Sequence, residues 1–422
     1  MTHELYAENS PQRFWRLLEE APAEAWREAV SRAATVLPPD ARSGTGDVEI
    51  ESILERTLGE MQFGPRHWDL GRLQRTYYTL KPFLPRSLTR RMKRAHGTRR
   101  AGAGRLGWPI ETRYVDFQFE LVRHLLDIIG RSSLPFINFW PDGMRYAFVL
   151  THDIETAQGQ AFTRSVADLD LSFGFRSSFN FVPARYRVDG ELMDELRARG
   201  FEIGVHGLKH DGRDFASVRE FMRRAARMNG FMAEYNASGF RSPLTHRNPD
   251  WMQALDIEYD GSFFDTDPYE PIAGGTMSIW PFQMGRFVEL PYTLTQDYTL
   301  VEVLGETTPD LWLEKVDYLS ANHGMVLLNT HPDYLRKAGT WRIYAEFLEA
   351  MRERADFHHA LPRDVARWWR ARSSASGVDE LPGAETATID LAGVISRLGP
   401  ASPRDRCASR TEGARSSAGR TA

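Results

Sequence analysis

Short apolar runs alternate with helical stretches between Arg145 and Trp369, and this alternation constrains the fold more than any other feature of the chain. Seven of the runs read as strands: YAFVLTH, RSSFNFV, FEIGVH, SGFR, IEYDGSF, RFVELP and MVLLNT. Helical stretches such as GELMDELRARG, DFASVREFMRRAARMNGFMAEY and TPDLWLEKVDYLSANHG stand between them. Strands joined through helices pair in parallel, so the pattern predicts an α/β barrel or a doubly wound sheet.

The segments on either side of this region differ from it in composition. Residues 1–140 are expected to be mainly helical, with periodic stretches such as FWRLLEEAPAEAWREAV. Residues 141–372 hold the alternating region. Residues 373–422 are rich in Ser, Ala, Arg and Gly and have almost no aromatic residues, so we expect a largely disordered tail.

A basic run, RSLTRRMKRAHGTRR, extends from Arg86 to Arg100 within the N-terminal region. Runs of like charge are commonly solvated linkers. The alternative is a patch that contacts an anionic lipid, a phosphate or an acidic polysaccharide. Both interpretations stay open at this point.

Charge and cysteine content exclude several classes of protein. The 53 basic and 57 acidic residues nearly balance, so no nucleic-acid partner is expected. The single cysteine, Cys407, excludes a disulfide within the chain and a thiolate metal cluster. No apolar run is long enough for a signal peptide or for the roughly 20 residues of a membrane span. We therefore expect a cytoplasmic protein without a transmembrane segment.

Polar residues follow four of the predicted strands. In parallel α/β folds, reactive groups gather at the carboxyl ends of the strands, around one cavity. The residues at these positions are Thr151, His152, Asp153 and Glu155 after the first strand, His206 and His210 after the third, Arg241 after the fourth, and His331 and Asp333 after the last. Their repeated position predicts a single site.

The histidines at positions 206 and 210 indicate a metal site when a carboxylate lies nearby. Gly207 stands where a zincin motif has glutamate, which disfavours a metalloprotease of that class. Two imidazoles and one carboxylate, with a position left open for water, form a common catalytic site for a divalent metal. Asp153 and Glu155 repel each other unless a cation intervenes, although they also fit a helix cap.

The motifs THDIE, HGLKH, RSPL and LNTH, in this order, resemble the signature of the polysaccharide deacetylase family, the NodB-homology domain of family-four-like carbohydrate esterases. The resemblance covers about Arg145 to Trp369 and is that of a divergent member. Ile154 stands where most members have a second aspartate. Leu244 and Thr245 replace the Tyr-Gly that often follows the arginine motif.

The resemblance implies a distorted (β/α) barrel of about seven parallel strands with one divalent metal of the zinc type. By position, His206 and His210 resemble the metal ligands. Glu155 is expected as the third ligand, because members with a D-x-D form use the second acid in this way.

The resemblance also implies catalytic roles. Asp153 resembles the general base, Arg241 the residue that steers it, and His331 the general acid. Apart from the resemblance, the aspartates of YDGSFFDTDPYEP are expected to hydrogen-bond the catalytic imidazole or to line the rim, and Asp260, which follows a strand-like run, is the first choice among Asp260, Asp265 and Asp267. Nearby aromatic residues either form a platform for sugar rings or belong to the core; they are Phe263, Phe264, Trp280 and Tyr292.

The implied activity is hydrolysis of an N-acetyl (or O-acetyl) group on a carbohydrate or glycan precursor, with an acetylated sugar or polysaccharide as the substrate. Two alternatives stay open. The same barrel also serves hydrolases of non-sugar amides, which acetate release would separate from a deacetylase. The second alternative is a catalytically silent carbohydrate-binding protein that has lost its metal through the change at Glu155. The metal content of the purified protein would separate it from an active enzyme.

Overall fold

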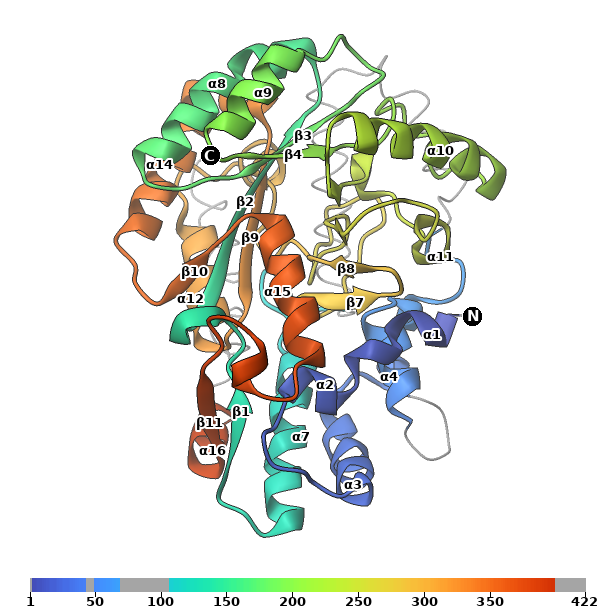
Figure 1. Ribbon diagram of the computed structural model, residues 1–422, viewed down its shortest axis with the longest axis vertical. Coiled ribbons are helices and arrows are strands. Elements are labelled where there is room, and N and C mark those ends of the chain that lie inside the picture. Colours follow the sequence, from blue (N-terminus) through green and yellow to red (C-terminus); the bar gives the residue numbers. More distant parts are fainter. Residues whose placement is uncertain (1, 43–48, 69–105, 399–422) are drawn as a thin grey trace, which may run out of the picture.

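A computed structural model describes residues 2–42, 49–68 and 106–398. Its central feature is a curled sheet in the order β10-β2-β3-β4-β5-β6-β8-β7, with β9 paired to the other edge of β2 (Figure 1). The strands are β2 (Tyr146–Ile154), β3 (Ser178–Phe181), β4 (Glu202–Val205), β5 (Gly239–Phe240), β6 (Tyr259–Asp260), β7 (Phe282–Met284), β8 (Phe287–Glu289), β9 (Met325–Thr330) and β10 (Phe357–His359). The pairs are parallel except for β7 with β8.

The chain therefore folds as a distorted (β/α) barrel, as the sequence predicts, and all seven predicted strands are present. After β8, the backbone N–H groups of Thr293 and Leu294 donate to the carbonyl of Leu327 in β9, which draws the two ends of the curl together. All nine residues of β2 are buried, because the strand pairs on both edges and is covered on both faces.

Helices surround the curled sheet, with α8, α9 and α14 at the upper left of the strands and α10 and α11 at their right in Figure 1. The side chains of Thr156, Asp189 and Ser217 cap the first turns of α8, α9 and α10. The helical elements of this region are η6 (Pro141–Gly143), α8 (Ala157–Ser172), α9 (Gly190–Ala198), α10 (Val218–Glu234), η7 (Pro243–Thr245), α11 (Pro249–Met252), η8 (Tyr298–Leu304), α12 (Asp310–Ala321), α13 (Pro332–Leu335), α14 (Ala338–Arg352), α15 (Pro362–Ser374) and η9 (Val378–Glu380). Within the described ranges, no helix is long and apolar enough to cross a membrane.

The region before the barrel is mainly helical, as expected. It contains α1 (Thr2–Tyr6), η1 (Ala7–Asn9), α2 (Pro11–Trp15), α3 (Ala23–Ala33), η2 (Ala34–Val36), η3 (Pro39–Ala41), α4 (Ile50–Thr57), η4 (Met61–Phe63), α7 (Arg113–Ile129) and the short strand β1 (Ser133–Ile137). The basic run from Arg86 to Arg100 lies outside the described residues.

The prediction of a largely disordered tail is wrong for residues 373–398. Strand β11 (Thr386–Asp390) pairs antiparallel with β1, and α16 (Leu391–Leu398) packs on α7. The guanidinium of Arg397 lies over the ring of Phe119 at 3.9 Å. The segment gains its order from a partner strand about 250 positions earlier in the chain, which composition cannot reveal. Residues 399–422 lie outside the described part.

The helical region and the barrel share one hydrophobic core. Trp15 of α2 and Phe139 are both buried in it, and their ring centroids lie 5.6 Å apart. Arg372 of α15 fastens the two regions with hydrogen bonds to the carbonyls of Phe14, Ile137 and Asn138. The division between residues 1–140 and 141–372 stays a prediction, since the core is continuous across it.

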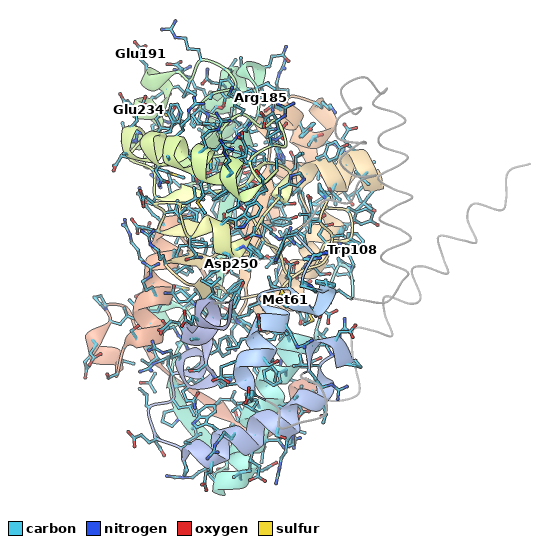
Figure 2. The ribbon with its side chains drawn as sticks, turned by 90° about the vertical axis from the view of Figure 1, so that its right-hand side faces the viewer. Met61, Trp108, Arg185, Glu191, Glu234 and Asp250 are labelled. Atoms are coloured by element: carbon cyan, nitrogen blue, oxygen red, sulfur yellow. The ribbon has the colours of Figure 1, made fainter. Side chains whose placement is uncertain are left out.

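A buried ion pair makes a second connection. Glu60, beside Met61 at the level where the N-terminal helices meet the barrel (Figure 2), accepts three hydrogen bonds from Arg247, one from Nε and two from Nη2. Both side chains are fully buried. The guanidinium of Arg247 also lies 4.5 Å from the ring centre of Phe264 and 5.1 Å from that of Trp68.

Replacing Glu60 by glutamine should lower the free energy of unfolding by about 3 kcal/mol near neutral pH, because Arg247 would stay buried without its counter-charge. Burial raises the pKa of Glu60, but Arg247 and His67 hold it below the usual 4.5. The ionic contribution is therefore present above that value and lost as the pH falls through the lowered pKa. Denaturant titrations at neutral and acidic pH would measure both effects.

The matched control is Glu28→Gln, which removes an exposed ion pair with Arg32 and should change stability by about 0.5 kcal/mol or less. Equal losses for the two variants would contradict the importance of the buried pair.

Candidate functional site

A cavity of about 370 Å³ opens at the carboxyl ends of the barrel strands. It is lined by six of the seven residues predicted to form the site: Asp153, Glu155, His206, His210, Arg241 and His331. They reach it from the ends of β2, β4, β5 and β9; β9 pairs with β2 and β4 pairs with β5, while β3 lies between the two pairs. The parallel order of the strands thus gathers residues that lie far apart in the chain.

Three side chains in the cavity are close enough together to hold one metal ion. The ligand atoms that Glu155, His206 and His210 can offer all lie within 4.8 Å of one another. Oε1 of Glu155 lies 3.0 Å from Nε2 of His210. These are the three residues that the sequence predicts as ligands.

The imidazole of His206 is oriented to present a free lone pair. Its Nδ1 lies 3.0 Å from the backbone carbonyl of Arg241 and donates to it, so Nε2 carries no proton in the neutral ring. That Nε2 atom is buried and has no hydrogen-bond partner in the structure. Burial lowers the pKa of His206 to about 4, against the opposing charge of Asp153. The ring is therefore neutral near pH 7, the form that binds metals.

Glu155 is ionised at the same place. Burial alone would raise its pKa, but the charge and hydrogen bond of His210, together with His331 and His206, hold the pKa well below the usual range. One carboxylate with two imidazoles is the donor set of many catalytic zinc sites. The unpartnered Nε2 of His206 and the ionised Glu155 both fit a divalent cation.

Asp153 is held by neutral donors on two sides and by a cation on a third. Its oxygens accept hydrogen bonds from the side-chain amides of Asn180 at 2.8 Å and Asn329 at 2.9 Å. Nε of Arg241 lies 3.7 Å from Oδ1. Burial alone would raise the pKa of Asp153, but His206 and Arg241 bring it below the usual value. Because His206 is neutral near pH 7, Arg241 and the protonated His331 are the cations that act on this carboxylate at that pH.

The partner of His331 is Asp297, and the prediction that Asp260 fills this place is wrong. Nδ1 of His331 lies 2.7 Å from Oδ1 of Asp297, whose Oδ2 accepts from the backbone N–H of His331 at 3.0 Å. Burial alone would lower the pKa of His331, but Asp297, followed by Glu155 and Asp153, raises it to about 10. The ring therefore carries a proton on Nε2 near neutral pH, 4.0 Å from Oε1 of Glu155.

Asp260 lies in the wall behind Arg241, outside the cavity lining. It accepts hydrogen bonds from the backbone and hydroxyl of Ser262. Burial raises the pKa of Asp260, and it also raises that of Glu289, its neighbour on β8. Asp260 sits at a strand end as expected, but its side chain faces β8 rather than β9.

The aromatic residues considered as a sugar platform belong to the core. Phe263, Phe264, Trp280 and Tyr292 are at most 1% exposed. Tyr298 and Tyr334 line the cavity instead, with ring centroids 5.1 Å apart. Sequence reasoning missed both tyrosines and Asp297. Asp297 and Tyr298 stand in LTQDYTL, a short distance beyond the strand RFVELP, so a search extended past the immediate strand end would have found them.

Comparison with known proteins finds solved structures of similar fold but no match by sequence. No family model matches the chain, and no curated protein matches it. A protein from Mycobacterium smegmatis assigned as a polysaccharide deacetylase shares 20% identity at a TM-score of 0.46, over 56% of this chain and 94% of its own. A probable polysaccharide deacetylase from Pseudomonas aeruginosa PAO1 shares 14% at 0.47, over 56% and 95%.

Puue allantoinase is similar to the same degree, with 14% identity and a TM-score of 0.47 over 55% of this chain and 92% of its own. A likeness of this kind concerns the fold, so function must be inferred from the residues of the site itself.

Replacing Asp297 by asparagine should lower the pKa of His331 from its value of about 10, because a neutral amide cannot stabilise the imidazolium. Nitrogen NMR of the histidine rings, followed across pH in chelator-treated protein, would measure the change. His359, whose pKa burial lowers, is the internal control and should titrate as before. An unaltered His331 titration would mean that Asp297 does not set its charge.

Proposed function

We propose that this chain is a metal-dependent hydrolase of carbon–nitrogen bonds other than peptide bonds, which removes acetyl groups from an acetylated sugar or polysaccharide. The observation that carries the proposal is that Asp153 lies 3.8 Å from His206 and His331 lies 4.0 Å from Glu155, so that both border the group formed by Glu155, His206 and His210 within one cavity. The resemblance of the four motifs to the polysaccharide deacetylase family supports it.

Glu155, His206 and His210 are the proposed ligands of one divalent cation, with zinc as the first candidate. When bound, such an ion polarises a carbonyl group and makes a nearby water more acidic. The chain's own residues account for the movement of protons.

Asp153 is the proposed general base. It is ionised beside Arg241, and the amides of Asn180 and Asn329 fix the direction of its oxygens. A base must accept a proton in the transition state, so it has to be charged beforehand. Asp153 takes a proton from water as the water oxygen attacks the acetamide carbonyl carbon.

His331 is the proposed general acid. Its Nδ1–H is fixed on Asp297, so Nε2–H is the proton that faces the cavity. This proton passes to the departing nitrogen as the carbon–nitrogen bond breaks. The products are a free amine and acetic acid, which releases its proton to solvent to give acetate, and the proton held by Asp153 restores His331 at the end of the cycle.

Metal analysis tests the ligand assignment. The purified protein should hold about one zinc ion per chain after exposure to zinc, and His206→Ala should lose most of it, since a tetrahedral site cannot spare one of three protein ligands. Asp153→Asn is the matched control: it should keep the metal while turnover falls at least about a hundredfold. Equal metal in wild type and His206→Ala would remove these residues from the proposed site.

Dependence on the leaving group tests the role of His331. His331→Ala should retain metal and lose about a hundredfold or more in acetate release from acetamides, whose nitrogen must be protonated as it leaves. Activated acetyl esters have leaving groups that need no proton, so their hydrolysis should suffer far less. A similar loss on both kinds of substrate would show that His331 is not the acid.

A panel of substrates separates the proposal from its alternatives. Acetate release from N-acetyl sugars supports a deacetylase, whereas hydrolysis restricted to non-sugar amides supports the related activity. If the protein binds sugars, holds no metal and releases no acetate, it is a catalytically silent carbohydrate-binding protein.

A further inference from the structure

Four carboxylates line the cavity, and three of them have a basic partner. Asp153 lies 3.7 Å from Arg241, and Glu155 lies 3.0 Å from His210. Glu302 is paired with Lys337. The fourth is Glu270. Among the residues that the structure describes, no lysine, arginine or histidine forms an ion pair with it.

Neutral groups alone hold Glu270. Its Oε1 accepts a hydrogen bond from the side-chain amide of Gln296 at 3.0 Å. Its Oε2 lies 2.9 Å from the hydroxyl of Thr245, which also lies 2.7 Å from the carbonyl of Leu244. One hydroxyl proton cannot serve both acceptors, and a carboxylate has room for about four donors. Glu270 therefore has acceptor capacity left over.

Glu270 is only 6% exposed, so water compensates its charge poorly. A buried carboxylate is costly unless a cation or several donors accompany it. The other cavity acids have such a partner within the chain. A ligand with a positive charge would find at this wall an oriented carboxylate that lacks a counter-charge and has acceptor capacity left.

The position of Glu270 relative to the reactive group is fixed by two side-chain amides. Gln296, which donates to Glu270, accepts from the amide of Asn329 at 3.4 Å, and Asn329 donates to Asp153 at 2.9 Å. Both amides are at least nine-tenths buried. A group bound at Glu270 is thus connected to Asp153 through Gln296 and Asn329, within the same cavity.

We propose that Glu270 is a specificity-determining residue that binds an ammonium group carried by the substrate, next to the acetamide that is hydrolysed. The inference rests on the proposed function for the identity of the reacting group. The substrate class is then an amino-sugar chain in which a free amine accompanies an N-acetyl group, that is, a partly deacetylated chain. An uncharged hydroxyl at the same place would hydrogen-bond the carboxylate but leave its charge unbalanced.

Binding of disaccharides to the zinc-loaded full chain tests the ammonium site without any need for turnover. The probes are chitobiose, which carries two amines, and cellobiose, which carries hydroxyls in their place, at slightly acidic pH, where the amines are protonated. Wild type should bind chitobiose more tightly by calorimetry. Glu270→Gln should weaken chitobiose binding about tenfold and leave cellobiose unaffected, because only the charge is removed.

Glu302→Gln is the matched control, since this cavity acid already has Lys337 as its partner, and it should behave as wild type. Equal binding of the two disaccharides by wild type would overturn the inference. So would a Glu270→Gln variant that loses both disaccharides equally, or a Glu302→Gln variant that loses chitobiose as severely.

Acetate release then separates this inference from the proposed function. Glucosamine linked to N-acetylglucosamine, in both orders, is compared with di-N-acetylchitobiose. Faster release from an amine-bearing probe, reduced about tenfold in Glu270→Gln, supports both statements. If no probe releases acetate but chitobiose binding still depends on Glu270, the deacetylase function fails and the ammonium site stands. If all probes react equally in both proteins, the ammonium site fails and the deacetylase stands.

Discussion

The burial of two carboxylates at the end of β2 is the constraint on which the rest of the site depends. A strand buried at every residue carries Asp153 to the floor of the cavity, and Glu155 follows immediately after it. Two acids in such a place are unstable without compensation. The ends of β4 and β5, two and three strands along the sheet, supply it: Arg241 beside Asp153, and His210 beside Glu155. The polar composition of the strand ends thus follows from the electrostatics of one buried strand.

Some of the charged groups in the site are balanced by side chains of the protein itself, whereas other polar atoms are left to be satisfied by a ligand. Arg241 and Asp297 are fixed: the first keeps Asp153 charged, and the second keeps His331 protonated. Among the described residues, Nε2 of His206 has no hydrogen-bond partner and the carboxylate of Glu270 has unused acceptor capacity, so both can bind a ligand from solution. A base, an acid and two open positions in one cavity of about 370 Å³ are the parts that a hydrolase of a small polar group requires.

The sequence predicts those features that depend on local pattern. All seven predicted strands are present, and six of the seven residues predicted for the site line the cavity, because buried parallel strands are apolar runs and their carboxyl ends converge. The prediction for Asp260 was wrong because a position at a strand end shows that a residue lies at the carboxyl edge of the sheet but does not show which neighbouring strand its side chain faces. Asp297 and Glu270 lie in long connections, where no periodicity marks a position. Strand β11 was missed because its partner, β1, is distant in the chain.

The N-terminal region contacts residues that support the wall of the cavity. Glu60 holds Arg247, and Arg247 donates through Nη1 to the carbonyl of Thr245. Thr245 has a positive φ of 50°, a conformation that costs energy for a β-branched residue and persists only where neighbours hold it. Its hydroxyl reaches Glu270. A chain of contacts therefore runs from Glu60 in the helical region to the Glu270 carboxylate in the cavity lining, so the described N-terminal helices help to set the shape of this wall as well as the stability of the fold.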